Sequence, residues 1–260
     1  MSPLSFCRAE RDGRLLIVTI DRPEVMNALH RPASLELTEV FDDFANDPEL
    51  WVAIVTGAGD RAFCAGNDLK FQAAGNDTTL PPSGFGGLTG RFDLDKPVIA
   101  AVNGLAMGGG FELALACDLL IAVETAVFAL PEPKVGLAAT GGGLLRLPRQ
   151  IAVKQAMGMI LTGRRVTAAE GQAFGFVNEV VAPGQALTAA RRWADEIMTG
   201  SPMSVRASKQ LVYSGLERPL DEAYRDQRTL PAVAALYASE DKIEGPQAFA
   251  EKRKPVWKGR

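Results

Sequence analysis

The sequence is poor in residues that bind metals, form disulfides or act as nucleophiles. It contains one histidine, His30, and three cysteines, Cys7, Cys64 and Cys117. Zinc and iron sites need a cluster of such ligands, which excludes a metalloenzyme of that kind. Ser–His–Asp and Cys–His mechanisms need a histidine beside the nucleophile, but His30 lies apart from every cysteine. Three cysteines cannot form a disulfide framework, so we expect buried free thiols in a reducing compartment.

Long apolar runs and an excess of one charge are also lacking. The net charge is −3, from 28 basic and 31 acidic residues spread along the chain. This balance argues against binding to nucleic acid or to an anionic membrane. The apolar stretch 113–123 is interrupted by Cys117-Asp118 and is too short to span a bilayer. The first residues show no basic segment followed by an apolar core. We therefore expect a cytoplasmic protein.

The sequence does contain apolar strands that alternate with glycine turns and helices. Hydrophobic residues make up 47% of the 260 residues, which suits one large domain or one domain with a small appendage. Such alternation predicts an α/β fold whose strands are covered on both faces. The predicted strands are Leu15–Ile20, 51–56, 97–102, Leu119–Val123, 127–130 and 176–181.

Helices are predicted between and after these strands. Leu37, Val40, Phe41 and Phe44 recur at helical spacing, and a second helix runs from the glycines at 108–110 to about residue 117. Residues 144–175, 185–199 and most of the chain beyond 202 are also predicted as helical. The last helices are rather polar, so we expect them to pack on another subunit as well. Residues 75–90, rich in Gly, Pro, Thr and Ser, predict a mobile surface loop.

The most informative local pattern is the glycine run 108–110 at the start of an apolar helix. Three glycines there let a ligand approach the backbone and leave N–H groups pointing outward, where the helix dipole favours negative charge. Such a turn can bind an oxyanion, or it can simply pack the helix tightly against a strand. A P-loop is excluded because no Gly-Lys-Ser/Thr follows. Glu112 lies in a helix without a polar face, so it is either a partly buried functional carboxylate or a solvent-exposed acid favoured by the dipole.

Two further segments are less specific candidates. Glu132 lies between Pro131 and Pro133, which hold it in a rigid conformation that could aim its carboxylate or could be an ordinary exposed turn. Residues 63–69 follow a strand and could present a backbone N–H to a ligand. They could equally form a compact turn in which Asp68 caps the next helix.

A dinucleotide site is a remote alternative. Residues 57–62 read Gly-Ala-Gly-Asp-Arg-Ala after a predicted strand and match the loose GxGxxA fingerprint. No helix-forming run follows directly, because Gly66 and Asn67 intervene. Residues 80–83, about 20 positions on, lack the acidic residue that would bind a ribose. An NAD-dependent oxidoreductase is therefore poorly supported.

Taken together, in this order and spacing, the segments resemble the enoyl-CoA hydratase/isomerase (crotonase) superfamily along essentially the whole chain. The resemblance implies an α/β fold with a crotonase-type ββα spiral in residues 1–199 and a C-terminal helical trimerisation region in residues 200–260. It also implies a homotrimer or a dimer of trimers, no metal, and coenzyme A only as part of the substrate. The matching pieces are 21–23, 27–29, 63–69, 96–112, 128–136, 161–163 and 175–178.

The same resemblance implies roles for individual residues. The two catalytic glutamates of the family fall on Glu112 and Glu132, and its oxyanion hole falls on the backbone N–H groups of Asn67 and Gly109. The positions that contact coenzyme A, the last two often from a neighbouring subunit, are Met26, Ala28, Ala65, Asp68, Leu69, Phe249 and Lys252. The positions around the acyl group are Gly108, Pro131, Thr140 and Gly141.

The carnitinyl-CoA dehydratase (crotonobetainyl-CoA hydratase) branch of this family is especially similar. The similarity is visible in residues 85–89, 94–103, 109–116 and 256–260. Residues 138–141, Ala-Ala-Thr-Gly, differ both from the Val-Pro-Asp-Ser of that branch and from the Pro-Gly of ordinary short-chain hydratases. The choice between a crotonobetainyl and a short-chain enoyl substrate therefore stays open.

The activity implied is that of a hydro-lyase, which adds water reversibly across the α,β double bond of an enoyl-CoA thioester in fatty-acid or carnitine metabolism. Family members that lack one glutamate tend to run isomerisation or other thioester chemistry, so the presence of both favours hydration. By family analogy Glu112 activates the water and Glu132 protonates Cα, although the sequence itself does not fix these roles. A homologue that binds acyl-CoA for other chemistry, such as isomerisation, is the alternative.

Overall fold

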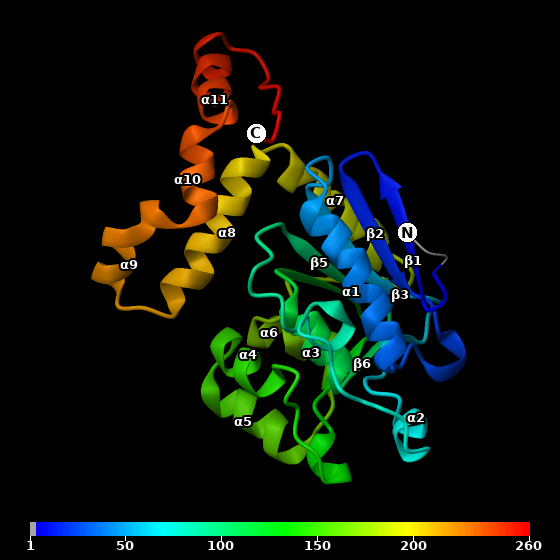
Figure 1. The fold of residues 1–260 in the computed structure, drawn as a ribbon. Helices are drawn as coiled ribbons and strands as arrows, with labels where there is room; N and C mark the ends of the chain where they lie inside the picture. The colour runs from blue at the N-terminus through cyan, green and yellow to red at the C-terminus, as the bar shows by residue number, and fades with distance from the viewer. Residues whose placement is uncertain (1–3) are drawn as a thin grey trace.

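Two β-sheets form the centre of the computed structural model, which describes residues 4–260 (Figure 1). The larger sheet has the strand order β1-β2-β3-β5-β7-β10 and the smaller one β4-β6-β8-β9. The strands of the larger sheet are β1 (Cys7–Asp12), β2 (Leu15–Ile20), β3 (Val52–Gly57), β5 (Val98–Val102), β7 (Leu119–Val123) and β10 (Glu179–Val181). Those of the smaller sheet are β4 (Ala62–Cys64), β6 (Leu105–Met107), β8 (Val127–Ala129) and β9 (Val166–Thr167).

Both sheets are mainly parallel. In the larger sheet β1 pairs antiparallel with β2, and the remaining pairs are parallel. In the smaller sheet β9 is the antiparallel strand. Strands β2, β3 and β5 are buried along their whole length, because α1 (Arg31–Asn46) and α7 (Ala186–Met198) pack on the larger sheet. This confirms the predicted α/β fold with apolar strands covered on both faces.

The remaining helices of the body surround the smaller sheet. They are α2 (Leu69–Ala73), α3 (Gly109–Ala116), α4 (Gly143–Gln150), α5 (Val153–Thr162) and α6 (Ala168–Phe174), with the short 3₁₀ helices η1 (Pro23–Val25), η2 (Phe85–Gly87) and η3 (Glu132–Val135). The predicted helical stretch 144–175 is thus confirmed as three helices, with breaks at residues 151–152 and at 163–167, where β9 lies. There, Val166 and Thr167 pair with Phe128 and Val127 of β8.

The prediction of a mobile surface loop over residues 75–90 is wrong for its second half. Residues 85–89 are buried against α1. The N–H of Gly86 donates to Ser34 Oγ at 3.3 Å, and a Cβ atom on Gly87 would lie 2.7 Å from the backbone of Leu37. The glycines that suggested an exposed loop instead allow two backbones to approach closely.

The C-terminal helices extend away from the body as an arm (Figure 1). They are α8 (Pro202–Leu216), α9 (Leu220–Asp226), α10 (Pro231–Ala238) and α11 (Asp241–Ala250), with the 3₁₀ helix η4 (Gln227–Thr229). The arm has its own small apolar cluster of Ala207, Ala232 and Val233. Its first helix is tied to the body by the ion pairs Arg206–Asp95 and Lys209–Asp118. That the arm packs on another subunit stays a prediction.

The three cysteines are buried free thiols, as predicted. Burial raises the pKa of Cys64 to about 12, so this thiol stays protonated at neutral pH and is a poor nucleophile. Among residues 4–260, no group of His, Cys, Asp and Glu side chains could hold a metal ion. Nor is any helix in these residues long and apolar enough to cross a membrane.

Candidate active site

Two backbone segments meet at the start of α3. A Cβ atom on Gly66 would lie 2.6 Å from the carbonyl oxygen of Met107 and 3.2 Å from the backbone nitrogen of Gly109. Gly66 also has φ +93°, a region that other residues avoid. Glycine is therefore required at this position for the segment before α2 to reach the first turn of α3.

Asn67, the next residue, is held in place by its neighbours. Leu29 forms a parallel bridge with it: the N–H of Leu29 donates to Gly66 at 2.8 Å, and the N–H of Asp68 donates to Leu29 at 2.9 Å. The N–H of Asn67 therefore points away from this bridge. In the part of the chain that the structure describes, neither this N–H nor that of Gly109 donates to a protein acceptor. Two free backbone donors thus lie close together.

Glu112 is buried in the first turn of α3, with 4% of its surface exposed. Its Oε1 accepts a 2.8 Å hydrogen bond from the N–H of Gly143, and its Oε2 faces Gly141, where a Cβ atom would lie 2.7 Å away. Burial, and also the charge of Glu132, raise the pKa of Glu112 to about 6, although the Gly143 and Gly141 N–H groups and Arg146 act in the opposite direction. A carboxyl group with this pKa can exchange a proton near neutral pH.

Glu132 begins η3 and is half-buried, so it is not an ordinary exposed turn residue. Its Oε1 lies against Gly108, where a Cβ atom would be 2.8 Å away. Its Oε2 is buried and has no hydrogen-bond partner among residues 4–260. Burial raises the pKa of Glu132, which favours the protonated form of a carboxyl group that lacks a partner.

Gly108 contacts both glutamates, the backbone of one and the carboxyl group of the other. Its carbonyl oxygen accepts the N–H of Glu112 at 3.0 Å, and its Cα faces Glu132. The structure therefore brings together both predicted glutamates and both predicted N–H donors, those of Asn67 and Gly109. Chemically, the site offers two acids in different environments beside a pair of donors that can bind an anionic oxygen.

Two of the four residues predicted around the acyl group belong to this arrangement, and the other two flank it in the sequence. Gly108 and Gly141 contact the two carboxyl groups directly, as described above. A Cβ atom on Gly163 would be 3.1 Å from the Cα of Pro131, which places Pro131 beside the end of α5. Thr140 is exposed, and its N–H donates to Ala138 at 2.8 Å.

Phe85 is a site residue that sequence reasoning missed. A Cβ atom on Gly109 would lie 2.8 Å from the Cζ atom of Phe85, so the aromatic ring covers the first residue of α3. The N–H of Phe85 donates to Thr89 Oγ1 at 2.8 Å, which fixes the backbone at this point. The sequence linked residues 75–90 with the acyl pocket as a segment, but neither composition nor spacing singled out Phe85.

Four of the residues predicted to bind coenzyme A lie in one region, in which Ala28 is buried. The N–H of Ala65 donates to Met26 at 3.0 Å, so these two segments lie side by side. Ala28 precedes the bridge between Leu29 and Asn67. Leu69 begins α2 and is 48% exposed.

Asp68 lies in the same region, but its carboxylate is already occupied. It caps α2 by accepting the N–H of Phe71 at 3.1 Å and forms a 3.1 Å ion pair with Arg22, whose side chain is 11% exposed, as is that of Asp68. Arg22 also donates to the carbonyl oxygen of Ala28. The capping role considered for Asp68 is confirmed. Its contact with coenzyme A stays a prediction.

Phe249 and Lys252 lie elsewhere in the chain. Phe249 is in α11 and is 87% exposed, and Lys252 follows the end of that helix. In Figure 1, α11 and α2 lie at opposite ends of the molecule. Within one chain these two residues are therefore distant from the rest of the predicted coenzyme A site.

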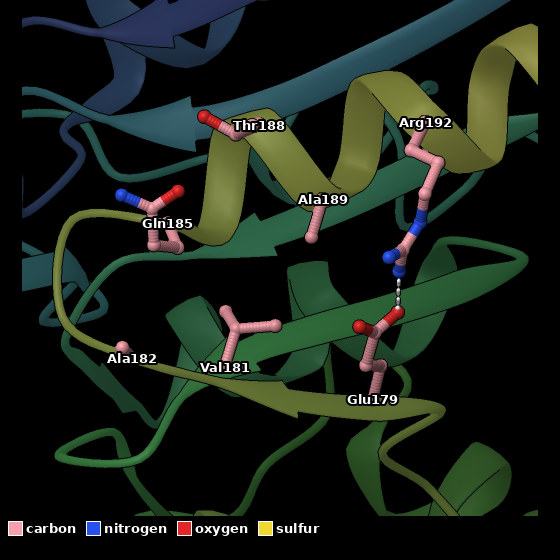
Figure 2. A pocket seen from close by; sticks show the side chains of 7 residues that line it. All are labelled: Glu179, Val181, Ala182, Gln185, Thr188, Ala189 and Arg192. Atoms are coloured by element: carbon pink, nitrogen blue, oxygen red, sulfur yellow. Dashed lines mark hydrogen bonds and ion pairs between the residues drawn. The ribbon is translucent and has the colours of Figure 1, made fainter.

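A surface hollow between β10 and α7 does not compete with this site. Figure 2 shows its lining, in which Glu179 pairs with Arg192. The indole N–H of Trp193 also donates to Glu179, at 2.7 Å. The charged groups of the hollow thus satisfy one another, and none of the predicted site residues lines it. The dinucleotide alternative also fails, because β4 follows the Gly57–Gly59 turn where that motif needs a helix.

The chain is similar to known proteins along almost its whole length. Residues 10–260 match the family described as enoyl-CoA hydratase/isomerase. Proteins named carnitinyl-CoA dehydratase from Salmonella paratyphi A and Citrobacter koseri are both 48% identical over 254 residues, which is 96% of this chain and 97% of each relative.

Solved structures agree with this match. The enoyl-CoA hydratase from Mycobacterium tuberculosis H37Rv has a TM-score of 0.93 at 40% identity and covers 98% of this chain and 99% of its own. The carnitinyl-CoA hydratase from Mycobacterium avium has a TM-score of 0.79 at 43% identity, covering 99% of this chain and 100% of its own. These similarities confirm the predicted crotonase-type fold with its C-terminal helices. The family match and the relatives show that the chain is a hydro-lyase. The chain belongs to the enoyl-CoA hydratase/isomerase (crotonase) family.

Proposed function

We propose that this protein is an enoyl-CoA hydratase that adds water reversibly across the α,β double bond of an enoyl-CoA thioester. The observation that carries the proposal is the arrangement around Gly108. Gly108 accepts the backbone N–H of Glu112 and lies against the carboxyl group of Glu132, and the next residue, Gly109, carries one of the two free N–H groups. This is the set of groups that hydration of a thioester-conjugated alkene requires.

The two N–H groups act on the thioester oxygen. When water adds at Cβ, the electrons of the double bond move toward the carbonyl and leave an enolate with negative charge on this oxygen. Asn67 and Gly109 would meet that charge with donors that are already in place. Losing one such donor typically lowers the rate about 10²–10³-fold.

Each of the two glutamates carries out one of the two proton transfers. Water bonds to Cβ through its oxygen and gives one proton to the carboxylate of Glu112, while the carboxylic acid of Glu132 gives its proton to Cα. The pKa of Glu112, raised to about 6, leaves it mostly ionised at pH 7, as a base must be. Burial raises the pKa of Glu132 as well, and it is the family analogy that gives this group the role of the acid. The two groups titrate as a coupled pair and exchange proton states between turnovers.

The 48% identity to carnitinyl-CoA dehydratases favours a crotonobetainyl group as the acyl part of the substrate. A crotonobetainyl thioester has the same conjugated alkene as crotonyl-CoA and adds a quaternary ammonium group beyond it. The exposed Thr140, at the edge of the site, is the position where this chain differs from both kinds of hydratase. No further cofactor is needed for this chemistry.

Coenzyme A would lie along Met26, Ala28, Ala65 and Leu69. Phe249 and Lys252 would contact it from a neighbouring subunit, since they are distant from this surface in their own chain (Figure 1). This arrangement requires an oligomer, and we propose a homotrimer or a dimer of trimers, held by the C-terminal arm.

Hydration of crotonyl-CoA and crotonobetainyl-CoA, measured side by side with the purified protein, tests the proposal. Turnover of both, faster with crotonobetainyl-CoA, would identify the branch as well as the activity. Turnover of crotonyl-CoA alone would identify the protein as a short-chain hydratase. Isomerisation of a 3-enoyl-CoA without hydration of either compound would overturn the proposal and identify an isomerase.

A further inference from the structure

The glycines that follow Thr140 hold two opposite charges next to each other. Gly141 and Gly143 face the carboxyl oxygens of Glu112, as described above, and a Cβ atom on Gly142 would overlap Nη1 of Arg146. Gly142 has φ +115°, so both its backbone conformation and its surroundings exclude a side chain. The guanidinium group of Arg146 therefore lies over the glycine between the two that cradle Glu112.

Arg146 also reaches the segment that covers α3. Its Nη2 donates to the carbonyl oxygen of Thr89 at 2.8 Å. Thr89 in turn accepts the N–H of Phe85, the residue whose ring covers Gly109. The guanidinium carbon of Arg146 lies 5.2 Å from the ring centre of Phe92. Arg146 thus contacts both the glycine turn beside Glu112 and the segment that carries Phe85.

We infer that Arg146 is a positioning residue, which holds Glu112 ionised by its charge and fixes Phe85 over Gly109 by its bond to Thr89. This inference rests on the proposed hydration, because it assigns Glu112 the role of base. It adds a residue that contacts neither the alkene nor the thioester. Its two effects are separable, since one is electrostatic and the other depends on a hydrogen bond.

The surroundings of Glu112 agree with an electrostatic effect. Burial and Glu132, on η3, raise the pKa of Glu112, while the N–H groups of Gly143 and Gly141 and, by a smaller amount, Arg146, on α4, lower it. Arg146 is the only cationic side chain among these influences. Without it, the carboxyl group would keep its proton to higher pH.

The groups that face Arg146 leave its charge available to Glu112. They are Tyr213 on α8, Cys117 at the end of α3, and Glu112 itself. Burial raises the pKa of both Tyr213 and Cys117, so these two stay neutral near pH 7. Burial lowers the pKa of Arg146, but an arginine starts far above neutral pH and remains protonated.

The test is the dependence of kcat/KM for hydration on pH, which reports the essential acid and base of the free enzyme. Arg146→Gln should move the acid limb of this profile to higher pH, by less than about one pH unit, because an opposite charge nearby has been removed. Arg146→Lys should keep the limb in place, because it keeps the charge. Both variants should lower the plateau, because neither reproduces the bond to Thr89.

Arg149→Gln is the matched control. Arg149 is on the same helix, its side chain is 57% exposed, and its substitution changes the net charge equally. An acid limb that stays in place in Arg146→Gln, or that moves as far in Arg149→Gln or Arg146→Lys, would overturn the inference. Arg146→Met, which keeps the apolar stem, replaces Arg146→Gln if the latter unfolds at assay temperature.

Assays of the wild-type protein and of Glu112→Gln distinguish a wrong role for Arg146 from a wrong proposed function. If wild type does not hydrate either substrate, or if Glu112→Gln remains active, the hydratase mechanism itself is wrong. If Glu112→Gln is inactive while Arg146→Gln keeps the wild-type profile, only the role of Arg146 is wrong.

Discussion

The N–H of Gly143 donates a 2.8 Å hydrogen bond to Oε1 of Glu112. This bond ties the first turn of α3 to the first residue of α4 and partly offsets the burial of a carboxyl group inside an apolar helix. A buried carboxylate is costly unless such donors satisfy it. The desolvation cost that this bond does not offset remains, and it falls on the carboxyl group that the proposed chemistry uses as its base.

Glu112→Gln and Glu132→Gln should each fold and lose hydration by at least about 10²-fold, because each removes one proton transfer. The measurement is kcat with crotonobetainyl-CoA or crotonyl-CoA, whichever the wild type prefers. Glu124→Gln, an exposed glutamate between β7 and β8, is the control and should keep full activity. Near-normal hydration in either site variant would remove that carboxyl group from the mechanism.

Stability should depend on pH through Glu112. The pKa of this group is about 6 when folded and ordinarily 4.5, so the folded state binds more protons between these values and stability falls as pH rises through them. The loss is complete above pH 6 and amounts to about 2 kcal/mol. Relative to wild type, Glu112→Gln should therefore gain stability as pH rises from 4.5 to 6, as measured by urea unfolding. A difference that is constant with pH would contradict this.

Gly66→Ala should lower hydration by about 10²-fold or more, because its Cβ atom would displace Met107 or Gly109 and so misplace a backbone donor. Gly75→Ala is a close control. Gly75 also has positive φ, +78°, but no heavy atom lies within 4 Å of a Cβ there. Both variants should lose some stability from backbone strain, roughly 1–3 kcal/mol. Only Gly66→Ala should lose activity, and equal loss in both would rule out a specific effect on the donors.

Asp68→Asn should destabilise the protein by roughly 3–5 kcal/mol, since it leaves the largely buried Arg22 without its partner. Asp77→Asn, at an exposed ion pair with Arg31, should change stability little. Thermal unfolding compares the two. A raised KM for acyl-CoA with unchanged stability would instead show that Asp68 contacts coenzyme A directly.

Lys252→Ala should raise KM for the acyl-CoA substrate about tenfold with little change in kcat, because the residue would contact a phosphate and not the reacting atoms. Lys254→Ala removes the same charge two residues away and should have a smaller effect. If the contact comes from a neighbouring subunit, dilution below the assembly concentration should raise KM of wild type to that of the variant. An unchanged KM in Lys252→Ala would show that this lysine does not contact coenzyme A.

Much of the body could be predicted because its strands are apolar along their whole length. Leu15–Ile20 and Leu119–Val123 were found residue for residue, since both are buried on both faces. Strand β1 was missed because its charged residues, such as Arg8 and Glu10, face solvent at the edge of the sheet. Edge strands lack the apolar pattern on which such predictions depend.

The site was predicted unevenly for a related reason. Glu112 stood out as a charge in an apolar helix, and its burial is confirmed. Glu132 alone looked like a turn residue, because the contact of its Oε1 with Gly108 joins positions 24 apart in the chain. Phe85 and Arg146 depend on similarly distant contacts with Gly109 and Thr89, which no local pattern reveals.

The attachment of the C-terminal arm has a mechanical consequence. The Lys209–Asp118 pair is mostly shielded from water, with side-chain exposures of 16% and 18%, and Asp118 also accepts the N–H of Val98 at the start of β5. Salt screens such shielded pairs weakly. The base of the arm is thus fixed to the larger sheet by contacts that high salt should weaken little.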